Sequence, residues 1–520
     1  MVQILWVDDE IDLLKPHILF LSAKGYQVTP ATDGHEALDL LSEHPFDIVF
    51  LDENMPGLSG LDTLNLIKDK LPYIPVIMIT KSEEERIMEQ AIGSKISDYL
   101  IKPVNPNQIL LALKKHLDIR RLVSETSTIN YQQQFREISM KLMDRMNYEE
   151  WIEIYKKLVY WELELANSQD DSIFEILRQQ KDEANSLFCK FYEKNYIDWL
   201  SGKNEDKPML SHTVLRDKLF PVINNKDNKT HISTFLIVID NFRFDQWKAI
   251  QPMIEQFYRT ESEDIYYSII PTTTQYARNS LFAGLMPAEI QKKYPSLWVN
   301  EDVQGNKNQF EHELFQEQIK RYGINIKTTY HKVLNAQYGK RMIDNLSNMM
   351  QNELNIIVYN FIDMLSHART ESDIVRELAE DEKAYRAVTQ TWLEHSPLME
   401  VLKFLSDKKV NIMITTDHGS VKIDRPIRVK GDKDISTNLR YKVGRLIEYN
   451  TKEVFEVKDC SQIYLPKLSI TSPYIFSRSN DFFAYPNNYN QYVQYYMNTF
   501  QHGGISMEEV MIPFITLKNK

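Results

Sequence analysis

The sequence predicts a multidomain α/β protein in three parts: a five-stranded α/β domain, an all-α helical bundle and a second, larger α/β domain. Short apolar runs alternate with amphipathic stretches over residues 1–117, which is typical of a parallel sheet with covering helices. Residues 118–207 show helical periodicity and no strand pattern, and the α/β alternation returns over residues 208–520. The 520 residues are enough for three ordinary domains or two large ones.

The composition narrows the class of protein. Apolar residues make up 43% and charged residues 26%, as in ordinary globular proteins. The formal net charge of −12 disfavours nonspecific binding to duplex DNA. The two cysteines, Cys189 and Cys460, are too few and too far apart for a disulfide framework or a thiolate zinc cluster. We find no apolar run of the length that spans a bilayer and no signal-peptide pattern, so we expect a cytoplasmic protein.

The first domain is expected to be a flavodoxin-like (βα)5 fold. Its candidate strands are separated by stretches in which apolar residues recur at helical spacing. Folds of this kind bind ligands at the carboxyl ends of their strands. The candidate strands are Ile4–Val7, Tyr26–Ala31, Asp47–Leu51, Pro75–Thr80 and Asp98–Ile101.

Polar residues follow these strands at the ligand-binding edge. Asp8 and Asp9 follow the first strand and Asp52 follows the third. Three clustered carboxylates repel one another unless a divalent cation lies among them, and oxygen ligands suit Mg²⁺. One carboxylate can then act as a nucleophile toward a phosphoryl group, with Lys102 and the cation balancing the charge.

These residues resemble the response regulator receiver domain. The motifs are DDE at residues 8–10, DENMPG at 52–57, Thr80 and the pair Lys102–Pro103. The resemblance implies phosphorylation by a sensor histidine kinase and the following roles: phosphoacceptor Asp52, acidic pocket Asp8 and Asp9, Thr80 as the hydroxyl that follows the phosphate, aromatic switch Tyr99, ion-pairing Lys102, and Mg²⁺ ligands Asp9, Asp52 and Asn54. Lys81 departs from the small residue usual after the threonine, so we expect a difference in phosphodonor access or in the dephosphorylation rate.

The middle of the chain is predicted to be a helical bundle. Methionines such as Met140 and Met143, and then Trp151 and Trp161, recur at helical spacing and are expected in its core. Residues 201–208 are typical of a linker. We find no helix-turn-helix pattern with a basic recognition helix, so sequence-specific duplex DNA binding is not expected.

The last domain carries polar residues at the ends of apolar runs. FLIVID ends at Asp240, NIIVYNFID ends at Asp363, and NIMITTDHG contains Asp417 and His418. His367 lies four residues after Asp363, so the two side chains share a helical face and can bind one metal ion. The remaining candidates are the three threonines Thr272, Thr273 and Thr274 after YYSIIP, and His502 in the glycine-rich turn QHGGIS.

These residue types favour a pair of metal ions. Imidazole and carboxylate ligands without thiolate suit Zn²⁺ or Mn²⁺. Seven candidate ligands are too many for one tetrahedral ion and suit two ions, roughly 4 Å apart, that clamp a phosphoryl group. A threonine bound to such an ion at a helix start would ionise and become the nucleophile. Three carboxylates and one alkoxide offset two divalent ions, which favours a phosphodiester monoanion over a monoester dianion.

The set resembles the alkaline phosphatase superfamily, especially its PglZ branch and the nucleotide pyrophosphatase/phosphodiesterases. The resemblance implies one zinc held by Asp240, Thr274, Asp417 and His418, and another held by Asp363, His367 and His502. Its motif register makes Thr274 the nucleophile, with Thr272 as the fallback and Thr273 pointing away. Ala277 stands where the phosphodiesterases place a phosphate-binding asparagine, and Arg278 either replaces that contact or is a solvated helix residue.

The three parts together resemble the PorX-like two-component response regulators of Bacteroidetes, which are linked to type IX secretion and gliding. The resemblance implies a zinc-dependent phosphodiesterase output domain with oligonucleotides as substrates, a phosphorylation-dependent homodimer, and contacts with a sigma factor or the secretion motor. The dimer face would include the fourth helix, the fifth strand with Tyr99, and the fifth helix of the first domain. The alternative is a signalling adaptor that binds proteins and whose zinc site is structural.

Overall fold

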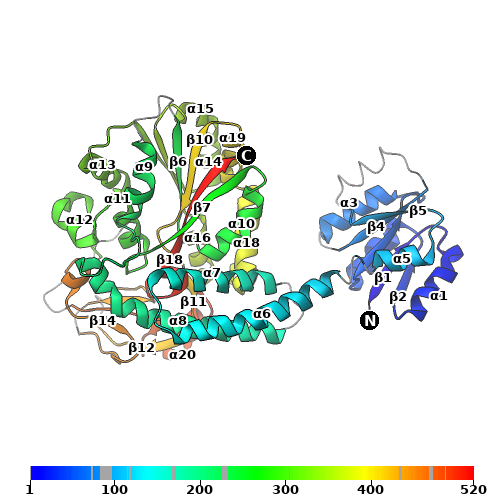
Figure 1. Ribbon diagram of the computed structural model, residues 1–520, viewed down its shortest axis with the longest axis horizontal. Helices are drawn as coiled ribbons and strands as arrows, with labels where there is room; N and C mark the ends of the chain where they lie inside the picture. Colours follow the sequence, from blue (N-terminus) through cyan, green and yellow to red (C-terminus); the bar gives the residue numbers. More distant parts are fainter. Residues whose placement is uncertain are drawn as a thin grey trace. The chain divides into compact units, whose positions relative to one another are not determined.

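The chain folds into two compact units, residues 1–131 and 132–520, each with its own hydrophobic core. A computed structural model describes residues 2–71, 74–81, 96–113, 115, 119–166, 171–224, 232–301, 303, 305–431, 436–444, 446–467, 472–486 and 488–520 (Figure 1). The predicted boundary at residue 207 lies inside the second unit, because the helices before it pack on the domain after it. The division of that unit into a bundle and an α/β domain stays a prediction from the sequence.

The first unit is the predicted doubly wound α/β domain. Its sheet is parallel throughout, in the order β2-β1-β3-β4-β5. The strands are β1 (Gln3–Val7), β2 (Gln27–Ala31), β3 (Ile48–Asp52), β4 (Val76–Thr80) and β5 (Asp98–Ile101). The described helices are α1 (Lys15–Ala23), α2 (Gly34–Glu43), α3 (Gly60–Lys70) and α5 (Pro106–Leu113). The predicted fourth helix falls on residues 82–95, which lie outside the described residues.

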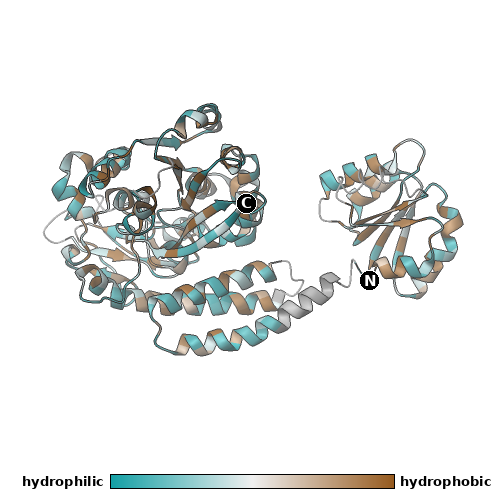
Figure 2. Ribbon diagram, turned by 45° about the horizontal axis from the view of Figure 1, so that its top comes forward, coloured by the Kyte–Doolittle hydropathy of each residue, from teal (hydrophilic) through white to brown (hydrophobic). Residues whose placement is uncertain are grey.

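Both faces of this sheet are buried, which explains why its strands are continuous apolar runs. Ile4 and Trp6 of β1 pack into one core, and Leu5 and Val7 pack into the other. The strands are mostly hydrophobic, and the helices beside them mix hydrophilic and hydrophobic residues (Figure 2). The two cores fill the faces of the sheet, and the acidic residues Asp8 and Asp52 lie at the strand ends.

The second unit contains long helices that pack on its α/β part. Helix α7 (Tyr148–Leu165) begins with a capping box between Asn147 and Glu150 and packs against α8 (Asp171–Ser201). Its Tyr155 ring lies 5.9 Å from that of Phe244, on α10 (Phe244–Ile254). Helix α6 (Ile119–Met143) precedes them and begins within the residues of the first unit, which ends at residue 131. Met140 and Met143 are 62% and 86% exposed, so the prediction that they belong to the core was wrong.

A six-stranded sheet forms the centre of the second unit, in the order β7-β18-β10-β6-β9-β8. Only β18 runs antiparallel to the other strands. The strands are β6 (Ser233–Ile239), β7 (Tyr258–Tyr267), β8 (Thr328–Val333), β9 (Leu354–Tyr359), β10 (Val410–Thr415) and β18 (Met511–Asn519). Because β10, β6 and β9 are parallel neighbours, their carboxyl ends meet at one edge of the sheet.

Helices cover this sheet and three small sheets extend it. The helices are α9 (Phe220–Ile223), α11 (Asn279–Ala283), α12 (Pro287–Lys293), α13 (Glu311–Arg321), α14 (Ala336–Asp344), α15 (Leu346–Met349), α16 (Phe361–Glu371), α17 (Asp373–Leu378), α18 (Glu382–His395), α19 (Pro397–Ser406), α20 (Tyr489–Tyr496) and α21 (Met507–Val510). The small sheets are β11 (Val421–Lys422) with β17 (Phe500–Gln501), β12 (Arg425–Arg428) with β16 (Asp481–Ala484), and β13 (Tyr441–Val443), β15 (Tyr474–Phe476) and β14 (Phe455–Val457).

Buried ion pairs tie the long helices to the α/β part. Arg386 of α18 pairs with Glu162 of α7 and lies 3.0 Å from Asp245 of α10. Lys181 of α8 is 2.8 Å from Glu162. Burial alone would raise the pKa of Glu162, but Lys181 and Arg386 lower it to about 2. The carboxylates of this network are therefore held ionised inside the unit.

We expect Arg386→Met to lower the free energy of unfolding of the second unit by about 3–5 kcal/mol, because two buried carboxylates lose a shared partner. Urea denaturation of the full chain measures the loss. Lys518→Met is the matched control, since it removes an exposed pair 3.1 Å from Glu261 and should cost less than about 1 kcal/mol. Equal losses in the two variants would show that the buried network does not stabilise the unit.

Candidate metal centre and active site

The carboxyl edge of the large sheet brings three acidic residues together. Asp240 directly follows β6, and Asp417 lies two residues after the end of β10. Asp363 was expected at the end of a strand, but β9 ends at Tyr359 and Asp363 lies in the first turn of α16. Asp363 still lies close enough to Asp240 for their charges to interact, and it shares a helical face with His367.

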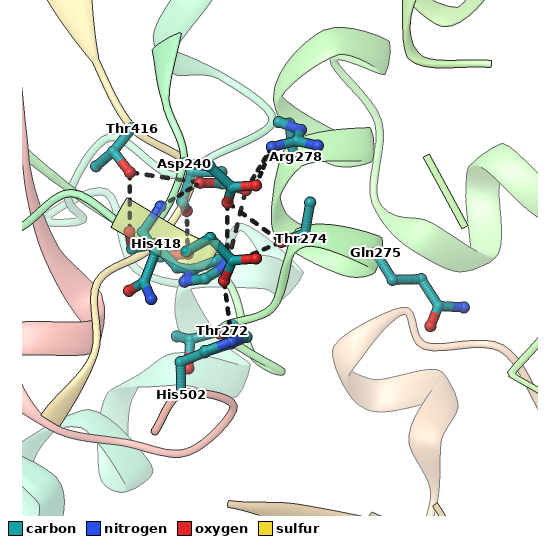
Figure 3. A network of polar contacts seen from close by, with 12 residues as sticks. Asp240, Thr272, Thr274, Gln275, Arg278, Thr416, His418 and His502 are labelled. Carbon is teal, nitrogen blue, oxygen red and sulfur yellow. Dashed lines mark hydrogen bonds and ion pairs between the residues drawn. The ribbon is translucent and has the colours of Figure 1, made fainter. Parts of the chain in front are cut away.

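The first cluster consists of Asp240, Asp417 and His418. One ligand atom of each lies within 4.8 Å of the others, and all three side chains are fully buried. The Thr274 hydroxyl lies 3.2 Å from Asp240 Oδ1 and 3.2 Å from His418 Nε2 (Figure 3). It comes from the first residue of a π-helical turn, Thr274–Arg278. The cluster thus offers two carboxylates, one imidazole and one hydroxyl.

The second cluster consists of Asp363, His367 and His502. His502 Nε2 and His367 Nε2 lie 3.5 Å and 3.6 Å from Asp363 Oδ1. The rings of His418 and His502 stack with their centroids 4.3 Å apart, so the two clusters adjoin. The His367 side chain is 61% exposed, which opens this side of the site to solvent.

Backbone carbonyls orient the two stacked histidines. The carbonyl oxygen of Thr272 lies 3.2 Å from His502 Nδ1, and that of Gly419 lies 3.1 Å from His418 Nδ1. A carbonyl can only accept, so each Nδ1 carries a proton. Each Nε2 faces carboxylates, where a bound metal ion would take its lone pair. Without added charge, burial disfavours protonated His502, but Asp363 raises the pKa of His502 overall.

The charges of the site are incompletely balanced by protein groups. Burial raises the pKa of Asp240 well above its ordinary value, although Arg278 opposes the shift. Burial lowers the pKa of His418 to about 4, so that ring is neutral at pH 7. Burial disfavours ionised Asp363, but His502 and His367 lower its pKa overall. Added positive charge would stabilise the ionised form of all three carboxylates.

The donor set fits divalent cations. Asp417 Oδ2 and Asp363 Oδ1 are buried and make no hydrogen bond among the described residues. Such oxygens are costly to bury unless something binds them. Two triads of carboxylate and imidazole, one beside a hydroxyl, match the N and O ligands that Zn²⁺ and Mn²⁺ take.

The three adjacent threonines have different surroundings. The Thr272 hydroxyl accepts from Gly503 N at 2.9 Å and donates to the Gly504 carbonyl at 2.9 Å. The Thr273 hydroxyl is buried and makes no hydrogen bond among the described residues. Only the Thr274 hydroxyl, among these three, lies within hydrogen-bonding distance of the first cluster. This geometry favours Thr274 over the fallback Thr272 as the nucleophile.

Arg278 is buried against the acids rather than solvated. Its Nη1 lies 2.6 Å from Asp240 Oδ2, and its Nε lies 2.6 Å from Glu311 Oε2 on α13. Lys332 lies 2.8 Å from the other oxygen of Glu311. The phosphate contact expected of Arg278 stays a prediction, since two carboxylates engage its guanidinium here. The interpretation of Arg278 as a solvated residue was wrong.

Sequence reasoning missed two residues that support Asp240, one by direct contact and one through Arg278. Asn360 donates to Asp240 Oδ2 at 3.1 Å, and Glu311 holds Arg278 in place. Asn360 lies inside the run that ends at Asp363, so its position after a buried strand could have pointed to it. Glu311 lies on an ordinary amphipathic helix, and no local pattern distinguishes it.

The first unit has a second acidic pocket at its strand ends. Asp8 and Asp52 are buried, Asp9 is exposed, and their carboxylates lie within 4.8 Å of one another. Lys102 Nζ lies 2.8 Å from Asp8 and 3.0 Å from Asp52. Burial raises the pKa of Asp52, although Lys102 opposes the shift. The oxygen ligands and one lysine suit Mg²⁺.

Other predicted residues lie around this pocket. The Thr80 hydroxyl donates to Glu53. Tyr99 on β5 is 39% exposed, and Asn54 is exposed two residues after Asp52. Lys81 lies 3.9 Å from Glu10, so the departure from the usual small residue places an ion pair beside the pocket.

Three family models match the chain. A model of the response regulator receiver domain matches residues 4–114, and one of the PorX response regulator linker domain matches residues 121–200. A model of the BREX system PglZ alkaline phosphatase-like domain matches residues 214–517, more than half of the chain. None of the helices among the described residues is long and apolar enough to cross a membrane.

Individual relatives share only part of the chain. The alginate biosynthesis transcriptional regulatory protein AlgB of Pseudomonas putida is 35% identical over 120 residues, 23% of this chain and 27% of that protein. The transcriptional regulatory protein ResD of Bacillus subtilis is 33% identical over 128 residues, 25% of this chain and 52% of that protein. The chain thus spans about a quarter to a half of the length of these curated relatives. The structure of chemotaxis protein CheY4 from Vibrio cholerae is 28% identical, with a TM-score of 0.22, and covers 22% of this chain and 99% of its own.

We expect the full chain to bind two equivalents of a divalent transition metal in the second unit. Asp363→Asn removes the only carboxylate of the Asp363–His367–His502 cluster. The metal equivalent that binds to this cluster should therefore bind at least tenfold more weakly. Titration with Co²⁺, followed by its absorption spectrum, measures both equivalents. Asp407→Asn, at an exposed position, should bind as the natural sequence does. Unchanged binding by Asp363→Asn would contradict this assignment.

Proposed function

We propose that the second unit of this chain is a di-zinc phosphodiesterase. The proposal starts from the fact that the chain belongs to the family with a BREX system PglZ alkaline phosphatase-like domain. The receiver domain before it makes the chain a two-component response regulator with a histidine kinase as partner. The observation that carries the proposed activity is the Thr274 hydroxyl, 3.2 Å from both Asp240 and His418 of the first of two adjoining clusters.

The residues of the site suggest a two-step reaction. Asp240, Asp417, His418 and Thr274 would hold one Zn²⁺, and Asp363, His367 and His502 the other. When bound, the ions favour the ionised hydroxyl and neutralise the phosphate oxygens. Thr274 Oγ1 gives up its proton and forms a bond to phosphorus, while the bond from phosphorus to the leaving alcohol breaks and that oxygen gains a proton. Water then cleaves the bond between phosphorus and Thr274 and restores the hydroxyl.

The charge around the site favours a diester. Three carboxylates and an ionised threonine balance two divalent ions. Arg278 and Lys332 add two positive charges and Glu311 adds one negative charge, which leaves the site with one excess positive charge. A phosphodiester monoanion neutralises this excess, whereas a monoester dianion leaves one negative charge. We therefore propose a diester substrate, with oligonucleotides as the candidate class.

For the receiver domain we propose phosphorylation on Asp52, with Mg²⁺ held by Asp9, Asp52 and Asn54. The support is the buried acidic pocket with Lys102 bonded to Asp8 and Asp52. A phosphorylation-dependent homodimer would use β5 and α5, where Tyr99 and Leu111 are 39% and 68% exposed.

The match to the PorX response regulator linker domain supports the remaining proposals. These are a cytoplasmic location, a role in type IX secretion and gliding, and contact with a sigma factor or the secretion motor.

The alternative function is a non-catalytic adaptor with a structural zinc site. Structural zinc sites are closed, with four protein ligands on each ion. The second cluster offers only three ligands, and one of them, His367, is 61% exposed. An open coordination position suits catalysis, so the enzyme is the better supported proposal.

We expect Thr274→Val to lower the rate of hydrolysis of a generic phosphodiester reporter by about a thousandfold or more, because the nucleophile is lost. The control is Thr273→Val, which replaces a buried hydroxyl that makes no hydrogen bond among the described residues. This variant should hydrolyse the reporter at the same rate as the natural sequence. Metal content is measured in parallel. Equal hydrolysis by Thr274→Val and the natural sequence, with metal bound in both, would exclude Thr274 as nucleophile and favour the adaptor.

Asp52→Ala should abolish labelling of the chain by a small phosphodonor in the presence of Mg²⁺, because the accepting carboxylate is gone. Asp39→Ala, at an exposed position of α2, should label normally. Intact-mass measurement detects the added phosphoryl group. A phosphoryl group that persists on Asp52→Ala would place the modification elsewhere.

A further inference from the structure

Two adjacent buried carboxylates on α21 lie directly after the metal-binding turn. Glu508 and Glu509 are 3% and 0% exposed. They follow the turn His502–Gly504 by a few residues and lead into β18 of the central sheet. Neighbouring residues on a helix point in different directions, and these two contact different parts of the unit.

Glu509 contacts the inside of the turn. Its Oε1 accepts from Gly504 N at 2.9 Å, and its Oε2 accepts from the Ser506 hydroxyl at 2.7 Å. Arg440 Nη2 lies 2.5 Å from Oε2, so an ion pair holds the carboxylate in place. The Glu509 carbonyl also accepts from Gly419 N at 3.2 Å, next to His418.

Thr272 links the same turn to the nucleophile segment. Its hydroxyl lies 3.3 Å from Glu509 Oε1 and bonds to Gly503 N and to the Gly504 carbonyl. Its own carbonyl accepts from His502 Nδ1. The orientation of His502 therefore depends on a backbone that Glu509 fixes from one side and Thr272 fixes from the other.

Glu508 points the other way, to the long helix α8. Asn185 Nδ2 donates to Glu508 Oε2 at 2.8 Å, and Asn185 Oδ1 accepts from Met507 N at 2.8 Å. Lys181 lies 3.0 Å from Glu508 Oε1 and 2.8 Å from Glu162 of α7. Asn185 and Lys181 lie within the linker-domain match, whereas α21 lies within the PglZ match.

Close packing fixes the distance between α21 and the first cluster. A Cβ added to Gly419 would lie 2.0 Å from the Glu508 carbonyl oxygen, so only glycine fits there. A displacement of α21 would therefore move the loop that carries Asp417 and His418 as well as the turn that carries His502. The first cluster is reached through the backbone of α21, whereas the Glu509 side chain bonds directly to the turn that carries His502, so the second cluster depends on it more.

We infer that Glu509 and the α8 residue Asn185 are positioning residues for the metal site: they hold α21, and through it His502, in the geometry that binds the second ion. The inference rests on the proposed two-metal function. It makes the linker domain a part of the site's support rather than a spacer between two domains.

The test is metal affinity of the full chain at a fixed free Zn²⁺ concentration set by a chelator. Asn185→Ala removes both bonds to α21, and Glu509→Gln removes the ion pair with Arg440 while keeping the size of the side chain. We expect each variant to bind the second equivalent about ten- to hundredfold more weakly. The Co²⁺ spectrum should lose the contribution of one site. Asn185→Asp, which keeps the acceptor for Met507 N but places a second buried carboxylate against Glu508, should weaken metal binding at least as much as Asn185→Ala.

Gln180→Ala is the matched control, because Gln180 is a buried amide on α8 that bonds instead to Phe135 and Ser139 of α6. It should lower the unfolding midpoint without weakening either metal equivalent. Equal metal affinity in the natural sequence, Asn185→Ala and Glu509→Gln would overturn the inference, as would an equal loss in Gln180→Ala. A natural sequence that binds fewer than two equivalents would instead overturn the proposed function.

Discussion

The structure depends on the burial of carboxylates at the carboxyl ends of adjacent parallel strands. In the second unit, Asp240 and Asp417 are fully buried beside each other after β6 and β10. Burial in a medium of low polarity makes such a pair costly unless positive charge compensates it. Arg278 supplies part of that charge, and Asp417 Oδ2 and Asp363 Oδ1, which make no hydrogen bond within the described part of the chain, show where further positive charge would bind. Metal ions between imidazole and carboxylate ligands would meet this need and would also ionise the neighbouring threonine.

The same constraint operates in both units, with different outcomes. In the first unit Lys102 contacts both Asp8 and Asp52, which leaves two of the three negative charges of the pocket uncompensated and suits one divalent cation and a phosphoryl group. In the second unit the added ligands are histidines, which suit tightly held transition metals. Parallel strands would thus provide the proposed phosphorylation site in one case and the proposed hydrolytic site in the other, because different residues follow them.

Much of this arrangement could be predicted from the sequence, and the failures have physical reasons. Buried parallel strands are continuous apolar runs, so Asp240 and Asp417 stood out where the runs ended. Asp363 was predicted at the end of a strand but lies at the start of α16. The first residues of this helix are apolar like those of the strand before it, so the sequence shows no break between the two elements. Periodicity indicates a helix but not which stripe is buried, and Met143 proved exposed. Glu509 reaches the metal-binding turn through tertiary contacts, which no local pattern reveals.

The most direct test of the central claim is anomalous diffraction at the zinc absorption edge from crystals of the full chain grown with Zn²⁺. We expect two peaks in the second unit, one among Asp240, Asp417 and His418 and the other among Asp363, His367 and His502. An absence of anomalous signal from both triads, with zinc present in the crystal, would contradict the claim.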